Sequence, residues 1–155
     1  MPRIIISDTS CLIILHKIGE LDLLRKVYET VTTTPEVEME FMAVLPDWIK
    51  IVNVKDKKYQ EILETQVDSG EASAIALAKE TESPLLLLDD LKARKLALKL
   101  NLKFTGTLGV INKAKQIGVL DKIKPIIDKL LTTDFRISDH IINEILKRNG
   151  EFINK

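Results

Sequence analysis

The sequence predicts an α/β protein in which helices cover both faces of a central parallel sheet of four or five strands. Short apolar segments such as Ile4–Ile6 and Leu85–Leu88 alternate along the chain with longer segments of helical periodicity. The chain has 155 residues, of which 45% are hydrophobic and 30% charged. This length and composition are typical of one globular domain, which we expect to span residues 1–155.

Four segments are predicted to be strands because they are short and apolar or rich in β-branched residues. A further segment, Trp48–Val54, alternates apolar and polar residues, which indicates an exposed edge strand or an extended connection. The four predicted strands are Ile4–Ile6, Val31–Thr34, Leu85–Leu88 and Lys103–Thr105.

The segments between these strands have the apolar spacing and the end signals of helices. Gly19 closes the first, Pro35 opens the third, and the capping sequence from Asp68 to Glu71 opens the Ala-rich fifth. The predicted helices are Cys11–Ile18, Glu20–Val27, Pro35 to Pro46, Lys57–Val67, Ala72–Lys79, Leu91–Leu100, Thr107–Ile117, Lys122–Leu131 and Ser138–Arg148.

Charge and cysteine content exclude several classes of function. Lys and Arg number 23, and Asp and Glu also number 23, so overall charge gives no signature of nucleic-acid binding and any attraction must be local. The one cysteine, Cys11, excludes an intrachain disulfide and a cysteine-based zinc site. Because Cys11 lies among apolar residues, we interpret it as part of the core.

Targeting signals are not predicted. The N-terminus reaches Asp8 too early for a signal peptide, and the longest apolar runs, such as Leu85–Leu88, are too short to cross a membrane. The default expectation is therefore a cytoplasmic protein with no membrane partner.

Carboxylates follow the predicted central strands. Asp8 comes directly after the first strand, and Asp89 and Asp90 come directly after the most apolar one. In parallel sheets, ligands gather at the carboxyl ends of the strands, and helices bearing Glu40 and Glu71 can present side chains to the same edge. Carboxylates that lie close together repel one another, and a divalent cation between them stabilises their ionised forms. Oxygen ligands suit Mg²⁺ or Mn²⁺. Such a metal activates water for attack on a phosphodiester.

The alternative interpretation is that these acids only cap helices. Asp8 or Ser10 suits the cap of the first helix, and Asp89 or Asp90 suits the cap of the helix from Leu91. The pair formed by Asp68 and Glu71 has the spacing of a capping box. Caps and metal ligands both occur where strands lead into helices, so spacing alone does not separate the two interpretations.

Four motifs, in order, resemble those of PIN-domain nucleases and cover nearly the whole chain. Ile6–Ile13 (ISDTSCLI) resembles the opening motif of the family, and Gly70–Ala78 (GEASAIALA) resembles its central acidic helix. Leu87–Arg94 (LLDDLKAR) and Thr105–Gly109 (TGTLG) are similar to the DUF3368-type branch, which is itself similar to the toxin ribonucleases of toxin–antitoxin systems.

This resemblance implies a three-layer α/β/α PIN-like fold and an endoribonuclease that depends on Mg²⁺ or Mn²⁺. The implied reaction is hydrolysis of phosphodiesters in single-stranded RNA by metal-activated water. The implied partners are RNA and, for a toxin, an antitoxin protein, and we also expect a homodimer.

The resemblance also assigns roles to individual residues. The catalytic acids would be Asp8, Glu40, Glu71 and Asp90, with Glu38 as the alternative to Glu40. The metal ligands would be Asp8, Glu71, Asp89 and Asp90, with Asp90 slightly preferred to Asp89. The supporting residues would be Ser10, Asp89, Arg94 and Thr107.

Basic side chains follow the Asp89-Asp90 pair, and they suit either phosphate contacts or an ordinary solvated helix face. They are Lys92, Arg94, Lys95, Lys99 and Lys103. The turn Thr105-Gly106-Thr107 similarly suits either phosphate binding by backbone N–H groups or a helix cap. His16 and His140 are each interpreted as packing or surface residues. Aromatic residues make up only 5%, so extensive base stacking is not expected.

Two other functions compete with a nuclease. One is a catalytically weak or inactive RNA- or protein-binding module on the same fold. The other is an aspartyl phosphotransfer protein, which is disfavoured because only Asp8 follows the first strand and the acidic pair Asp89-Asp90 comes late.

Overall fold

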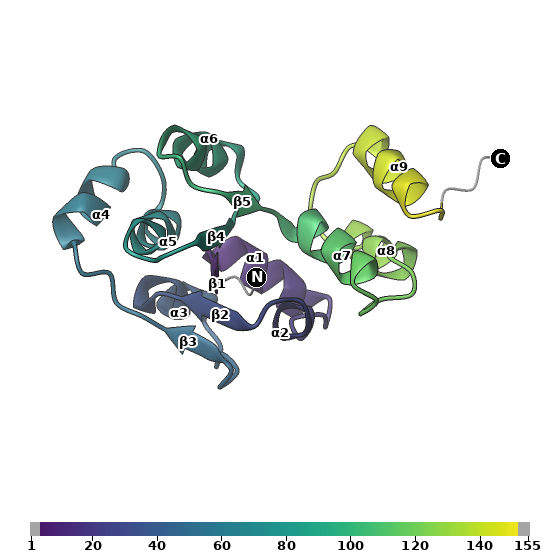
Figure 1. Cartoon of the computed structure of the whole chain (residues 1–155), viewed down its shortest axis with the longest axis horizontal. Coiled ribbons are helices and arrows are strands. Elements are labelled where there is room, and N and C mark those ends of the chain that lie inside the picture. Colours follow the sequence, from purple (N-terminus) through teal and green to yellow (C-terminus); the bar gives the residue numbers. More distant parts are fainter. Residues whose placement is uncertain (1–3, 152–155) are drawn as a thin grey trace.

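The computed structural model describes residues 4–151, which form a five-stranded, all-parallel sheet between layers of helices (Figure 1). The strand order is β3-β2-β1-β4-β5. The strands are β1 (Ile4–Ser7), β2 (Thr30–Thr33), β3 (Ile49–Ile51), β4 (Pro84–Leu87) and β5 (Phe104–Thr105). This arrangement confirms the predicted three-layer α/β/α fold, and the Trp48–Val54 segment contributes the edge strand β3.

Helices connect all of these strands. They are α1 (Thr9–Lys17), α2 (Leu23–Val27), α3 (Pro35–Phe41), α4 (Lys57–Leu63), α5 (Ser69–Lys79), α6 (Leu91–Lys99), α7 (Thr107–Gln116), α8 (Lys124–Leu131) and α9 (Asp139–Arg148). Several predicted boundaries were wrong, among them the end of α4, which lies at Leu63 rather than Val67. α3 ends at Phe41 because Met42 takes a left-handed conformation (φ 58°), and α2 begins only at Leu23.

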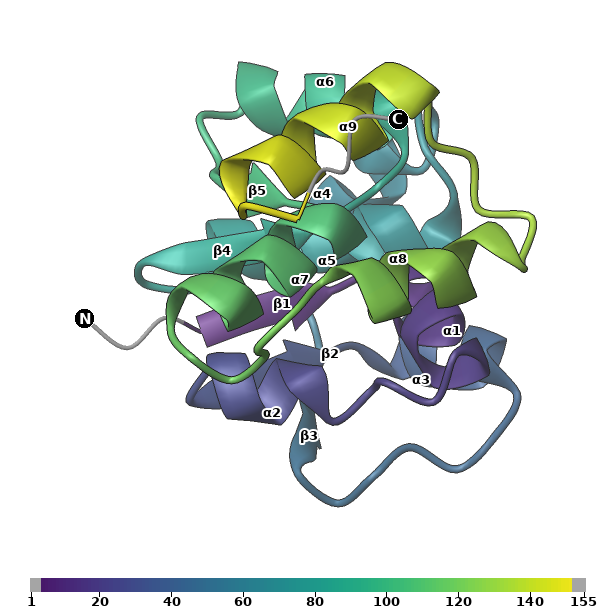
Figure 2. The same cartoon turned by 90° about the vertical axis from the view of Figure 1, so that its right-hand side faces the viewer.

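The central strands β1 and β4 have helices on both faces, which explains why they are apolar rather than alternating. Successive residues of β1 point to opposite faces, so Ile5 joins one apolar core and Ile6 joins the other. The Ile5 core includes side chains of α1, α2, α7 and α8, whereas the Ile6 core includes those of α5 and α6. Figures 1 and 2 show these helix groups on opposite sides of the sheet.

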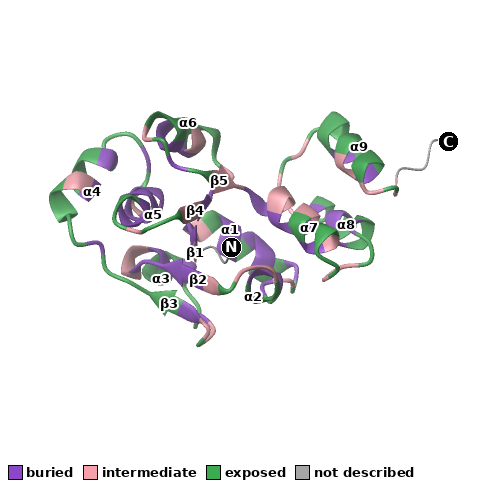
Figure 3. Cartoon of the chain, viewed as in Figure 1, coloured by how far each residue is buried: buried purple, intermediate pink, exposed green. Residues whose placement is uncertain are grey.

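Alanines bring α5 close to the central strands. Ala72, Ala74, Ala76 and Ala78 are all buried, and α5 packs against both β1 and β4. Figure 3 shows α5 as the most completely buried helix of its layer. Small side chains allow a short separation between helix and sheet, so the first turn of α5 reaches the carboxyl edge of β1.

The C-terminal helices α8 and α9 add to the core on the α1 side through residues such as Ile127 and Ile142. The end of α9 is fixed by Glu151, whose carboxylate accepts hydrogen bonds from Nζ of Lys115 (2.6 Å) and from the backbone N–H of Ile123 (2.9 Å). In the described part of the chain, no helix combines the length and apolar character that a membrane crossing requires.

Candidate active site

Polar side chains are buried at the carboxyl edge of the sheet, where β1 and β2 lead into helices. Thr33 donates a hydrogen bond from its hydroxyl to the backbone oxygen of Ser7 (2.7 Å), which ties β2 to the end of β1. The hydroxyls of Thr34 and Ser73 hydrogen bond to each other (2.7 Å) and so link α3 to α5. These contacts fix the ends of the elements that carry the predicted acids.

Asp8 lies at the centre of this edge and is completely buried. It caps α1 through Oδ1, which accepts a hydrogen bond from the N–H of Cys11 (3.1 Å). Its second oxygen, Oδ2, is buried and has no hydrogen-bond partner among residues 4–151. Asp8 is therefore both a helix cap and a carboxylate with a free, buried oxygen.

The pKa of Asp8 rises from its ordinary value of 3.8 to about 7, mainly because burial disfavours the charged form. The hydrogen bonds from Cys11 lower this pKa, and the charges of Asp89 and Asp68 raise it. Asp8 thus gains stabilisation from any cation that reaches Oδ2.

Glu71 lies on the first turn of α5 and is also buried, with 8% of its surface exposed. It forms a capping box with Asp68, because Oδ1 of Asp68 accepts from the N–H of Glu71 (2.8 Å) and Oε1 of Glu71 accepts from the N–H of Asp68 (3.4 Å). The pKa of Glu71 rises to about 7, first through burial and then through the charges of Asp68, Asp90 and Asp8. The capping box therefore holds Glu71 beside like charges.

Asp89 is the most fully partnered of the predicted acids. Its Oδ1 accepts a hydrogen bond from the N–H of Thr107 (2.9 Å), and its Oδ2 accepts from the Thr107 hydroxyl (2.6 Å) and from the Cys11 thiol (3.2 Å). The buried Cys11 has a raised pKa, mainly because of burial, so it stays a neutral donor and a core residue. Asp89 joins the start of α7 to the end of β4.

Asp90 is exposed and caps α6, since its Oδ2 accepts a hydrogen bond from the N–H of Ala93 (2.9 Å). Its charge contributes to the raised pKa of Glu71, whereas that of Asp89 contributes to the raised pKa of Asp8. The two neighbouring acids thus act on different members of the acidic cluster, which we define as Asp8, Asp68, Glu71, Asp89 and Asp90.

Glu40 reaches this edge from α3, although it is exposed. Its Oε1 accepts a hydrogen bond from the hydroxyl of Thr9 (2.5 Å), the residue after Asp8. A side chain at Gly70, the residue before Glu71, would overlap both Oε1 of Glu40 and Oγ1 of Thr9. The structure therefore brings Glu40 next to Thr9 and Gly70, the sequence neighbours of Asp8 and Glu71. Its predicted alternative, Glu38, is exposed two residues earlier on the helix.

Two polar neighbours of the acids were not predicted as site residues. Asp68 was interpreted only as a cap, but its capping box is what brings its charge close to Glu71. Thr9 was not singled out, although its hydroxyl contacts Glu40, while the predicted hydroxyl, that of Ser10, is exposed on the same turn. The capping-box spacing was the available signal for Asp68, and no sequence pattern indicated Thr9.

Arg94 does not lie on a solvated basic face. Its Nε donates to the backbone oxygen of Leu88 (2.6 Å), its Nη2 lies 3.9 Å from Oδ1 of Asp89, and its guanidinium covers the ring of Phe104 at 5.2 Å. Likewise, the N–H of Thr107 binds Asp89 rather than facing an open phosphate site. Arg94 and Thr107 therefore position Asp89.

Gly106 leaves the space that this network occupies, because a Cβ there would overlap Nη2 of Arg94 and Oδ1 of Asp89. We expect Gly106→Ala to lower the free energy of unfolding by about 2 kcal/mol, in the range of overpacking substitutions. Urea denaturation measures this cost. In an Arg94→Ala background the cost should fall by at least about half, because the guanidinium is gone. Equal costs in both backgrounds would contradict the described contact.

The acidic cluster fits a divalent cation that keeps much of its own water. Between Ile4 and Glu151, no three His, Cys, Asp or Glu side chains are grouped closely enough to hold a metal ion together. Mg²⁺, however, is usually bound by one or two carboxylates and several waters. The buried, unpartnered Oδ2 of Asp8 and the raised pKa of Glu71 are both relieved by positive charge at this point.

A family model of the PIN domain, in its DUF3368 branch, matches residues 4–151. The chain belongs to the PIN-domain family. PIN domains are generally nucleases that use divalent metals, and this agrees with the carboxylate chemistry at the sheet edge. A comparison with curated proteins and one with solved structures gave no match. The predicted family is confirmed.

In this PIN domain, the four acids predicted to be catalytic come from four different elements. Asp8 follows β1, Glu40 lies in the last turn of α3, Glu71 lies in the first turn of α5, and Asp90 precedes α6. The helix-cap and metal-ligand interpretations of the sequence are therefore compatible, since a cap occupies one carboxylate oxygen and leaves the other.

Proposed function

We propose that this PIN domain is an endoribonuclease that depends on Mg²⁺ or Mn²⁺ and hydrolyses phosphodiesters of single-stranded RNA. One observation supports this most strongly. Asp8 has a buried oxygen without a partner, and Asp8 and Glu71 both have a pKa of about 7. Two carboxylates that repel each other at neutral pH attract a divalent cation, which stabilises their ionised forms.

Asp8 and Glu71 would hold the metal, directly or through water, with Asp89 and Asp90 as further ligands. Bound Mg²⁺ or Mn²⁺ activates a water molecule and neutralises charge on the phosphodiester. Thr107 and Arg94 keep Asp89 oriented, which makes them positioning residues. Glu40 lies at the outer side of the cluster, where its carboxylate can accept a proton from water and Thr9 orients it through their hydrogen bond.

A matched pair of variants tests this function. We expect Glu71→Gln to slow the cleavage of a single-stranded RNA in Mn²⁺ at least about a hundredfold, equivalent to roughly 3 kcal/mol of transition-state stabilisation. Glu61→Gln, on the exposed side of α4, should cut at the wild-type rate. The assay follows a fluorescent oligonucleotide with Mg²⁺, with Mn²⁺ and with EDTA. Wild-type cleavage that persists in EDTA, or equal rates for both variants, would rule out the proposal.

The alternative, a weak or inactive binding module, predicts RNA or protein binding without metal-dependent cleavage in the same assay. The buried, unpartnered oxygen of Asp8 disfavours it, because a binding module gains nothing from a costly buried carboxylate. A toxin role and an antitoxin partner stay predictions from the family resemblance, and a homodimer stays a separate expectation.

A further inference from the structure

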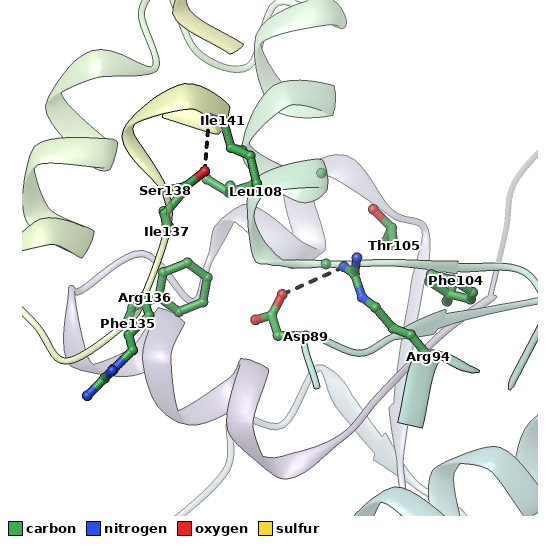
Figure 4. Close-up of a pocket in the computed structure, with 12 residues that line it drawn as sticks. Asp89, Arg94, Phe104, Thr105, Leu108, Phe135, Arg136, Ile137, Ser138 and Ile141 are labelled. Carbon is green, nitrogen blue, oxygen red and sulfur yellow. Dashed lines mark hydrogen bonds and ion pairs between the residues drawn. The ribbon is translucent and has the colours of Figure 1, made fainter. Parts of the chain in front are cut away.

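A cleft of about 570 Å³ adjoins the acidic cluster at Asp89. One wall is formed by α6, β5 and the start of α7, and the other by the segment that joins α8 to α9 and by the first turn of α9. Its volume is in the range of about 300–1,000 Å³ typical of sites for small molecules or single groups of a larger ligand. Figure 4 shows Asp89 between the two walls, with Arg94 on one side and Phe135 on the other.

Phe135 offers an aromatic ring in this cleft. The ring is half-buried and packs against the core, and the backbone N–H of Phe135 donates a hydrogen bond to the Thr133 hydroxyl (3.1 Å). The other aromatic residue of the cleft, Phe104, already has its ring covered by Arg94. The apolar side chains of Ile137 and Ile141 continue the wall beside Phe135. A flat, unsaturated group such as a nucleobase suits this surface.

Arg136, the residue after Phe135, adds positive charge to the same wall of the cleft. It is exposed and points away from Asp89 in Figure 4, and within residues 4–151 it has no hydrogen bond or ion pair. Arg94, in contrast, is engaged by Asp89 and by the backbone of Leu88. An unpaired guanidinium binds phosphate well because its fork of N–H groups matches two phosphate oxygens.

The cleft continues into a second cavity of about 420 Å³ between α7 and α9. The two cavities share Leu108, Gly109 and Ile141, so they adjoin along these helices. A ligand can therefore enter at Asp89 and leave along α9. Such an open path fits a segment of a polymer better than a free nucleotide.

We propose that this cleft binds the nucleotide next to the scissile phosphate of a single-stranded RNA, with its base stacked on Phe135 and its phosphate paired with Arg136. The inference rests on the proposed function. It deepens that function by naming the residues outside the acidic cluster that select and orient the substrate strand. Because the cleft offers one uncovered aromatic ring, we expect it to stack one base, in keeping with the low aromatic content of the chain.

Fluorescence anisotropy with a labelled single-stranded RNA tests this site in the Asp8→Asn background with Mg²⁺. Phe135→Leu keeps an apolar contact with the core but loses the ring, and we expect it to weaken binding about tenfold, whereas Phe135→Tyr should restore affinity. Arg136→Gln should lower the slope of log affinity against log salt by about 0.7, the value for one phosphate of a single strand. Leu131→Ala and Lys122→Gln, exposed outside the cleft, are the matched controls.

Steady-state cleavage by the protein that retains Asp8 separates this inference from the proposed function. With Mn²⁺, Phe135→Leu should raise KM about tenfold and change kcat much less. An unchanged KM and an unchanged affinity would overturn the cleft assignment even if cleavage is metal-dependent. If the wild-type protein does not cleave, the anisotropy series alone decides the assignment. Equal binding of the DNA oligonucleotide of the same sequence would overturn the choice of RNA.

Discussion

The Asp8→Asn variant is expected to be more stable than the wild-type protein by about 2 kcal/mol at about pH 8 without metal. With Mn²⁺, the same variant is expected to cleave RNA at least about a hundredfold more slowly. Burial raises the pKa of Asp8 from 3.8 to about 7, which corresponds to roughly 4 kcal/mol of cost for the ionised form. Asparagine removes the charge and can still accept the hydrogen bond from Cys11 through Oδ1. Part of the gain is lost because the new amide N–H group is also buried.

Urea denaturation and a cleavage assay on the same preparations measure the two effects. Asp56→Asn is the matched control, because Asp56 caps α4 with a similar hydrogen bond (3.1 Å, from Tyr59) but is exposed. That variant should change stability by less than about 0.5 kcal/mol and leave cleavage unchanged. A destabilised Asp8→Asn protein would show that the buried carboxylate contributes to folding rather than to function.

Mn²⁺ is expected to raise the melting temperature by about 5 °C at about pH 8 and by less than about 1 °C at about pH 5. Asp8 and Glu71 have raised pKa values of about 7, so between about pH 4 and pH 7 the folded state binds more protons than the unfolded state. The stability of the metal-free protein therefore falls as pH rises through this window. A cation replaces these protons, so its stabilising effect grows as the pH rises through 7.

Thermal melts in Mn²⁺ and in EDTA across this pH range test the linkage. The Asp8→Asn variant should lose most of the Mn²⁺ effect and keep only the part of the pH dependence that Glu71 contributes, whereas Asp56→Asn should keep both in full. A Mn²⁺ effect of the same size at both ends of the range, or in both variants, would indicate that the ion binds elsewhere on the surface.

Much of the fold was predictable because local patterns and tertiary contacts agree. The runs Ile4–Ile6 and Leu85–Leu88 are apolar on both sides, as central parallel strands require, and both are strands. The end of α3 was not predictable from Pro46, because the helix stops earlier at the left-handed Met42. The start of α2 was also missed, because apolar spacing continues through the turn that follows Gly19.

The candidate site was predictable only as far as chain order determines position. Parallel strands bring Asp8 and Asp89 to one edge, and that follows from topology. The role of Arg94 depends on Phe104 and Asp89, which come from other elements, so the sequence alone left phosphate contacts and a solvated helix face as its two interpretations. Phe135 lies in a connection without regular structure, and the overall aromatic content does not indicate where a single ring lies, so its place in the cleft was not predictable.

The size of the side chains at the alanine positions of α5 affects where Glu71 lies. Glu71 is carried by a helix that packs against β1, β4, α3 and α4, and the buried side chains of Ala72, Ala74, Ala76 and Ala78 allow this close packing. A larger residue at any of them displaces the helix, and Glu71 moves with it while every carboxylate is retained. Natural or designed variation at these sites can therefore lower the proposed metal-dependent activity in small steps. Acid-to-amide substitutions do not offer this, because each removes a whole charge.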